Sequence, residues 1–177
     1  MAKENIILTG FMATGKTTVG KKLAERLGYL FLDTDETIAE RAGMSVSEIF
    51  RQQGEAVFRR MEGELARELG NREKLVVSTG GRMMLDPANA EALSRKGRVF
   101  CLVATPEEIH DRVSRDRQVT RPLLEVADPM QRIADLLEAR EKAYERFPQL
   151  DTSGKTVDEV IQNLMDILTA DKDFSLG

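Results

Sequence analysis

The chain has 177 residues, 41% of them hydrophobic and 32% charged, which is the size and composition of one globular domain. Thirty acidic against 26 basic side chains give a net charge of −4, so we expect neither nucleic acid nor an anionic membrane as a partner. One cysteine excludes an internal disulfide, and one histidine excludes the paired-histidine metal motif. No apolar run approaches the length of a membrane span or a signal peptide, and we expect a cytoplasmic protein.

Short apolar runs of strand length alternate with longer segments of helical period. The runs lie at residues 6–8, 29–32, 75–77 and 99–103. Because they show little polar alternation, they are typical of parallel strands that helices cover on both faces. Repeated about five times, this β-α pattern predicts one α/β domain over residues 1–177, folded as a three-layer sandwich.

Capping signals mark where the helices begin and end. The first helix stops at Gly28, and Ser45 with Glu48 forms a capping box for a helix that breaks at Gly54 and resumes to about residue 69. A capping side chain precedes a proline at Asp86, Thr105 and Asp128. The last helix is expected over about 157–168, with a frayed tail after residue 171.

Two segments interrupt this rhythm. Residues 34–70 form a long helical insertion, and residues 114–127 are polar and rich in arginine. Ligands of open α/β folds bind beyond the carboxyl ends of the strands. We therefore expect substrate contacts in the first segment and a mobile lid in the second.

Residues 10–17 match the phosphate-loop motif G-x-x-x-x-G-K-[ST], with a strand before it and a helix after it. Backbone N–H groups of such a loop surround a β-phosphate, Lys16 bridges the β- and γ-phosphates, and the Thr17 hydroxyl binds Mg²⁺. The alternative is a glycine turn followed by a helix with an unrelated lysine. We predict that ATP is bound by Gly10, Ala13, Thr14, Gly15, Lys16, Thr17 and Thr18. The length of the chain favours a small-molecule kinase.

Asp33 and Asp35 follow the second predicted strand. At a period of two residues both carboxylates project to one side, which faces the phosphate loop if the two strands are neighbours. One carboxylate could hold Mg²⁺ and the other could accept a proton from an attacking hydroxyl. The alternative is that Asp33 caps a helix and Asp35 is solvated in its first turn.

Other candidates are weaker on local grounds. Arg59 and Glu62 share a helix face, where spacing alone favours an exposed ion pair. Gly80 and Gly81 at a strand end indicate either close approach to a ligand or a plain turn. The remaining candidates are arginines that could serve an anion or lie in solvent, namely Arg112, Arg115, Arg117, Arg121 and Arg140.

Together these features resemble the shikimate kinase family over about residues 5–168. The resemblance rests on 10–20, 33–35, 49–50, 54–55, 58–62, 80–81 and 121–124, and on Arg140 followed by Tyr144. It implies a P-loop NTPase fold with a five-stranded parallel sheet and helices on both faces. It also implies transfer of the ATP γ-phosphoryl group to the 3-hydroxyl of shikimate, in aromatic amino-acid biosynthesis, with Mg²⁺ as cofactor.

The resemblance also implies residue roles. Asp33 matches the aspartate near the metal, and Asp35 the one that binds substrate hydroxyls and acts as base. Arg59 and Arg140 match the pair that holds the substrate carboxylate, with Gly80 and Gly81 beside it. Arg121 matches the lid arginine and Arg112 the residue that stacks on adenine. A monomer is expected for a kinase of this size.

Two positions depart from the family pattern. Ala13 stands where the family usually has glycine. Arg82 stands where the third glycine of a triplet is usual. It either swings outward and leaves the function unchanged, clashes with the substrate, or adds a ligand for a more anionic substrate. Two alternatives follow: a kinase for another small hydroxy acid or sugar acid, and a nucleotide-binding paralogue without activity.

Overall fold

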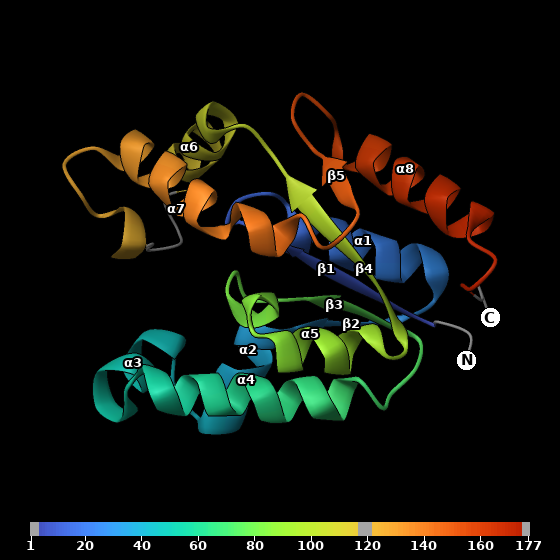
Figure 1. Ribbon diagram of the computed structural model, residues 1–177, viewed down its shortest axis with the longest axis horizontal. Coiled ribbons are helices and arrows are strands. Elements are labelled where there is room, and N and C mark those ends of the chain that lie inside the picture. Colours follow the sequence, from blue (N-terminus) through green and yellow to red (C-terminus); the bar gives the residue numbers. More distant parts are fainter. Residues whose placement is uncertain (1–3, 117–121, 175–177) are drawn as a thin grey trace.

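A computed structural model describes residues 4–116 and 122–174 of the chain. Its five strands form one parallel sheet in the order β2-β3-β1-β4-β5 (Figure 1). The strands are β1 (Asn5–Gly10), β2 (Leu30–Asp33), β3 (Leu75–Ser78), β4 (Gly97–Val103) and β5 (Gln149–Asp151). This confirms the predicted α/β architecture with a five-stranded parallel sheet.

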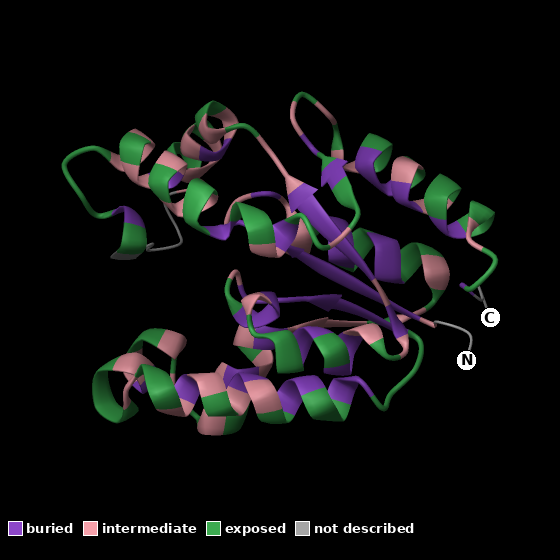
Figure 2. Ribbon diagram, in the orientation of Figure 1, coloured by how far each residue is buried: buried purple, intermediate pink, exposed green. Residues whose placement is uncertain are grey.

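Alternate strand residues are buried on opposite faces of the sheet. Ile7 and Val77 pack into a cluster with α2 (Thr34–Ala42), α3 (Val46–Gln53), α4 (Glu55–Leu69) and α5 (Pro87–Ser94). Ile6, Leu8 and Val76 pack against α1 (Lys16–Leu27) and α8 (Val157–Ala170) on the other face. The inner strands β1, β3 and β4 are therefore buried on both sides, the edge strands β2 and β5 are partly exposed, and the outer helix faces are exposed, as Figure 2 shows. These are the three predicted layers.

The predicted helix boundaries are confirmed by the observed caps. Gly28, with φ 67°, ends α1, and Gly54, with φ 87°, separates α3 from α4. The Ser45–Glu48 capping box opens α3. Capping side chains also open α5, α6 (Pro106–Arg115) and α7 (Pro129–Tyr144), in each case before a proline.

Two expectations about the end of the chain need correction. Strand β5 was not recognised from its residues, because Leu150 is its one buried side chain and the strand pairs on one edge only. The tail after residue 171 was expected to be frayed, but it packs against the protein up to residue 174. Phe174 is buried against the α1–α8 layer, and Asp171 pairs with Arg98 at 2.6 Å.

Helices α6 and α7 pack on each other beside the carboxyl edge of the sheet, around Phe11, Ile109 and Ile133. The chain between them includes the short helix η2 (Pro122–Leu124). Part of the predicted lid, at 117–121, lies outside the described residues, and Arg121 lies outside them too. Among the helices of residues 4–116 and 122–174, none has both the length and the apolar character needed to cross a membrane.

Candidate active site

The loop between β1 and α1 has a backbone that can surround an anion. Gly10 adopts φ 127°, and a Cβ there would lie 2.2 Å from the Leu102 carbonyl oxygen, so only glycine fits. Gly15, with φ 94°, precedes α1 without a side-chain cap. The first N–H groups of α1 are therefore left without a capping side chain, at the positive end of the helix dipole.

The Lys16 ammonium lies inside this loop. Its Nζ donates to the carbonyl oxygens of Gly10, at 2.9 Å, and Phe11, at 2.7 Å. Burial lowers the pKa of Lys16 from 10.5 to about 8, against the opposing charges of Asp33 and Asp35. A cation held in this way can turn to an incoming phosphate without leaving the loop.

Ala13 occupies a backbone conformation that favours glycine, with φ 59°. The left-handed region costs a residue with a side chain roughly 1–2 kcal/mol. Glycine avoids this cost but loses more conformational entropy on folding, so the net gain from glycine is smaller. We therefore expect Ala13→Gly to raise the free energy of unfolding by about 0.5–1 kcal/mol in urea titrations. A lower free energy of unfolding in this variant would contradict the claim that the Ala13 backbone is strained.

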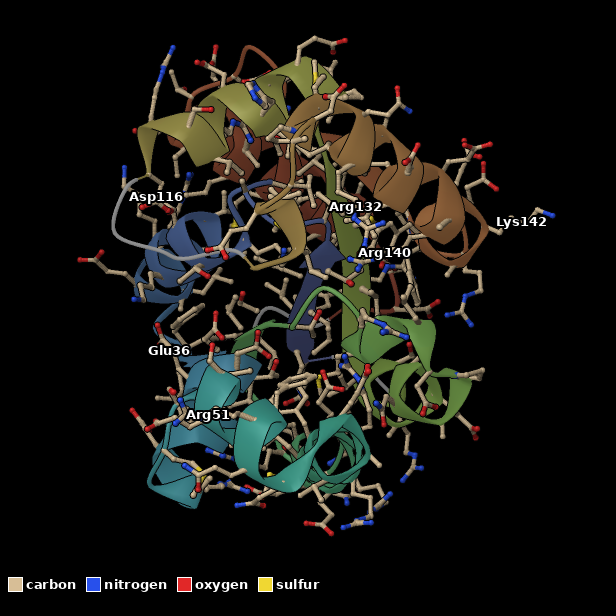
Figure 3. The ribbon with its side chains drawn as sticks, turned by 90° about the vertical axis from the view of Figure 1, so that its left-hand side faces the viewer. Glu36, Arg51, Asp116, Arg132, Arg140 and Lys142 are labelled. Atoms are coloured by element: carbon tan, nitrogen blue, oxygen red, sulfur yellow. The ribbon has the colours of Figure 1, made fainter. Side chains whose placement is uncertain are left out.

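A cavity of about 590 Å³ opens beside the loop. Phosphate-loop residues line it on one side, including the exposed Thr18, and Arg112, Thr152 and Lys155 line the other. Glu36 and Asp116 also line it and approach from α2 and from the end of α6 (Figure 3). Its position next to the N-terminus of α1 is where the rest of a bound nucleotide would lie.

Arg112 is held at the wall of this cavity by four hydrogen bonds. It donates to the carbonyl oxygens of Ala13 and Thr152, the Thr152 hydroxyl and the Glu108 carboxylate, at 2.7–3.1 Å. The guanidinium therefore ties the phosphate loop to the segment after β5. Stacking on adenine stays a prediction for this residue.

Asp33 caps a helix, as the alternative interpretation expects, and it also contacts the phosphate loop, while its role at a metal stays a prediction. Its Oδ1 accepts from the backbone N–H groups of Asp35 and Glu36 as the cap of α2, and its Oδ2 accepts from Thr17 Oγ1 at 3.0 Å. The assumption that β2 neighbours β1 is wrong, because β3 lies between them. Asp33 still reaches the loop because all parallel strands end at the same edge of the sheet.

The cluster of Thr17 and Asp33 fits Mg²⁺. Thr17 Oγ1 also lies 3.4 Å from Ser78 Oγ, so hydroxyl and carboxylate oxygens converge at the start of α1. Within residues 4–116 and 122–174, no group of three or more His, Cys, Asp or Glu side chains forms a metal cage. Mg²⁺ is commonly held by one or two protein oxygens together with phosphates and waters, which such a cluster can supply.

Asp35 is not the solvated side chain of the alternative interpretation. Its Oδ1 is buried and has no hydrogen-bond partner among the described residues. A Cβ on Gly80 would lie 2.5 Å from that oxygen, so glycine makes room for it. Burial, together with the Asp33 charge, raises the pKa of Asp35 from 3.8 to about 6, while Lys16 and Arg59 oppose the shift.

The expectation of an exposed pair between Arg59 and Glu62 is wrong. Arg59 Nη1 lies 2.6 Å from Glu62 Oε2, and Glu62 is 1% exposed. Its other oxygen, Oε1, is buried without a hydrogen-bond partner in the described part of the chain. Arg59 lies over the Phe50 and Phe58 rings, which fix the guanidinium on the apolar wall of α3 and α4.

Arg140 approaches the same region from α7. It is 8% exposed, its guanidinium lies 5.3 Å from the centre of the Phe11 ring, and a Cβ on Gly81 would be 3.4 Å from its Nη1. Figure 3 shows Arg140 turned into the protein, whereas Lys142 on the same helix points outward. The Tyr144 hydroxyl donates to the Gly81 carbonyl at 2.6 Å, a contact that the sequence did not indicate.

Arg82 turns to Glu55 on α4, and its effect on the substrate stays a prediction. Its Nη1 lies 3.0 Å from Glu55 Oε1, and the side chain is half exposed. Its backbone, with φ −113°, is ordinary for a residue with a side chain, so the structure does not require glycine there. Glu55 was not singled out as a site residue, because spacing gives no sign of a partner 27 positions away.

A strand, a glycine-rich phosphate loop and a helix, with paired carboxylates and buried cations beside them, define a P-loop kinase for a small acceptor. The shikimate kinase family model matches residues 12–169. The chain is 44% identical to the shikimate kinase of Caldanaerobacter subterraneus subsp. tengcongensis over 92% of this chain and 94% of that one. It is 46% identical to the enzyme of Geobacter sulfurreducens over 90% and 88%.

A solved structure gives the same result. The shikimate kinase of Acinetobacter baumannii in complex with shikimate superposes with a TM-score of 0.87 at 36% identity, covering 96% of this chain and 95% of that one. The chain belongs to the shikimate kinase family, the phosphotransferases that use ATP to phosphorylate a shikimate hydroxyl. A kinase for a different acid and an inactive paralogue are not favoured.

Proposed function

We propose that Lys16, Asp35, Arg59 and Arg140 carry the phosphorylation of the shikimate 3-hydroxyl in this chain. ATP would occupy the phosphate loop and the adjacent cavity. The acceptor would lie between Asp35, the Gly80–Gly81 segment and the two guanidinium groups. Arg59 and Arg140 would hold its carboxylate, because guanidinium groups bind carboxylates through paired hydrogen bonds.

One observation carries this proposal: the buried carboxylate oxygens Asp35 Oδ1 and Glu62 Oε1 both lack a hydrogen-bond partner in the described residues. A buried acceptor without a donor is costly, so such atoms call for a ligand that donates. Arg59 lies beside both carboxylates and carries the opposite charge. The hydroxyl groups of a polyhydroxy acid can donate to the buried oxygens, and its carboxylate can pair with Arg59.

In the reaction, the substrate hydroxyl oxygen attacks the γ-phosphorus, and the bond from that phosphorus to the bridging oxygen of ADP breaks. The hydroxyl proton passes to the Asp35 carboxylate. Lys16 stabilises the charge that develops on the phosphoryl oxygens, and the loop N–H groups hold the leaving diphosphate. Arg121, on the predicted lid, is proposed to add a further cation.

Mg²⁺ would be held by the Thr17 hydroxyl, with Asp33 binding it directly or through a water. When bound, the ion neutralises charge on the β- and γ-phosphates. Asp33 already orients the Thr17 hydroxyl and the first turn of α2, so the same side chain connects the metal site with Asp35.

The direct test is ATP consumption in a coupled assay, with shikimate and gluconate offered separately as acceptors. We expect turnover with shikimate and negligible turnover with gluconate. Faster turnover with gluconate would favour the sugar-acid alternative. ATP binding without transfer to either acid would favour the inactive paralogue.

The pH dependence follows from the two shifted groups. Asp35 must be ionised to accept a proton, so kcat/KM for shikimate is expected to fall below about pH 6. Lys16 must be protonated, so kcat/KM for ATP is expected to fall above about pH 8. The profile should be measured from about pH 5 to about pH 9, which is about one pH unit beyond each pKa. If both kcat/KM values stay constant over this range, the assignments are contradicted.

We also propose that the chain works as a monomer in the cytoplasm. The size of the chain, 177 residues, is what leads us to expect a monomer. Light scattering of the purified protein tests the oligomeric state.

A further inference from the structure

Arg82 belongs to a network of two arginines and two glutamates at the edge of the proposed acceptor site. Glu55 Oε1 accepts from Arg82 Nη1 at 3.0 Å, and also from Arg59 Nε at 3.1 Å and Nη2 at 3.0 Å. Arg59 donates in addition to the buried Glu62. One carboxylate oxygen is thus shared between Arg59 and Arg82.

The charges of this network show what Arg82 contributes. Glu55 and Glu62 both pair with Arg59, and burial raises the pKa of Glu62 while the charges of Arg59 and Arg82 oppose that rise. Arg82 adds a second cation to the network, at 3.0 Å from Glu55. The hydrogen bond and charge of Arg59, with the charge of Arg82, hold the pKa of Glu55 below its usual range, so Glu55 is ionised at neutral pH.

Arg59 is therefore already occupied by two carboxylates before an acidic substrate arrives. Three of the five N–H groups of Arg59 donate to the two glutamates, so a substrate carboxylate would use the other two, directly beside Glu55. An ionised Glu55 without a second partner would repel that carboxylate. Arg82 lies next to the proposed acceptor site, because it directly follows Gly81 in the chain. Its side chain is half exposed, and its Nη1 lies 3.0 Å from Glu55 Oε1.

We propose that Arg82 is a positioning residue for substrate binding: it holds and neutralises Glu55, which leaves Arg59 able to bind the substrate carboxylate. This inference rests on the proposed function, in which Arg59 binds that carboxylate. Arg82 itself does not touch the substrate. The simpler alternative is an exposed ion pair with little energetic effect, as is common at protein surfaces.

The test is a double-mutant cycle that follows KM for shikimate and KM for ATP in the coupled assay. Arg82→Gln removes the charge and keeps most of the side-chain length, and Arg82→Lys keeps the charge. Both are made in the wild-type and the Glu55→Gln backgrounds. The matched control is Arg41→Gln, because Arg41 is equally exposed at 53% and pairs with Glu68 on the outer side of α4.

We expect Arg82→Gln to raise KM for shikimate about three- to tenfold, with a smaller change in kcat and none in KM for ATP. In the Glu55→Gln background the same substitution should change KM by less than about twofold, because no charge remains to be offset. Arg82→Lys should stay close to wild type, and Arg41→Gln should leave all parameters unchanged.

An equal rise in both backgrounds would overturn the proposal, because Arg82 would then act on the substrate or on the fold. An unchanged KM in Arg82→Gln would overturn it in favour of a plain surface ion pair. Wild-type protein that fails to phosphorylate shikimate would overturn the proposed function first, an outcome that the variants cannot imitate.

Discussion

Replacing Lys16 by alanine is expected to lower kcat about 10²- to 10⁴-fold, because the transition state would lose the cation that we propose for the transferring phosphoryl group. The loss should appear with ATP at saturation, so weaker nucleotide binding alone cannot explain it. Steady-state rates from the coupled assay, with the ADP product confirmed by chromatography, measure it.

Lys21→Ala is the matched control for this experiment, because Lys21 lies on the same helix with its Nζ 5.7 Å from the centre of the Phe31 ring. It should keep the wild-type rate. Lys16→Met keeps the aliphatic stem and should be as slow as the alanine variant. Near-normal turnover in either Lys16 variant would exclude the phosphate loop as the catalytic centre.

Asp35→Asn is expected to lower kcat about 10²- to 10⁴-fold, because the amide cannot accept the hydroxyl proton. ATP should still bind, since the phosphate loop is intact. Glu40→Gln, an exposed change on the same helix α2, should leave the rate unchanged. An unaltered rate in Asp35→Asn would remove the base assignment.

The same variant should be more stable than the wild type at neutral pH. Folding raises the pKa of Asp35 to about 6, so the folded state binds the proton more tightly and the free energy of unfolding falls as pH rises through about 4 to 6. Above this window the full cost of a buried charge remains. Asparagine avoids that cost, and we expect a gain of about 1–2 kcal/mol in urea titrations at pH 8 and little gain at pH 4.

Local features of the sequence predicted most of the fold. Capping residues such as Ser45 and Asp86 act within one helical turn, so a short stretch of sequence contains the whole signal. The phosphate loop is equally local, since Gly10 and Gly15 set its turns and Lys16 follows directly. Strand β5 was not recognised because it has a single buried residue, and its stability comes from pairing with β4.

The candidate site was harder to predict because its contacts join distant segments. The burial of Glu62 depends on how α4 packs, and spacing on one helix could not distinguish it from a surface ion pair. The alternation of side chains along a strand predicts that Asp35 lies on the same side as Asp33, yet Asp35 lies in the first turn of a helix rather than in a strand. The Arg82–Glu55 contact spans 27 positions and has no local signal.

The most direct measurement is ³¹P and ¹H NMR of the product formed from ATP and shikimate by the wild-type protein. If a base, two guanidinium groups and a triphosphate meet around one acceptor, a single shikimate phosphate should accumulate in step with ADP, esterified at the 3-hydroxyl. Inorganic phosphate alone, or a mixture of phosphorylated positions, would contradict an acceptor held in one orientation.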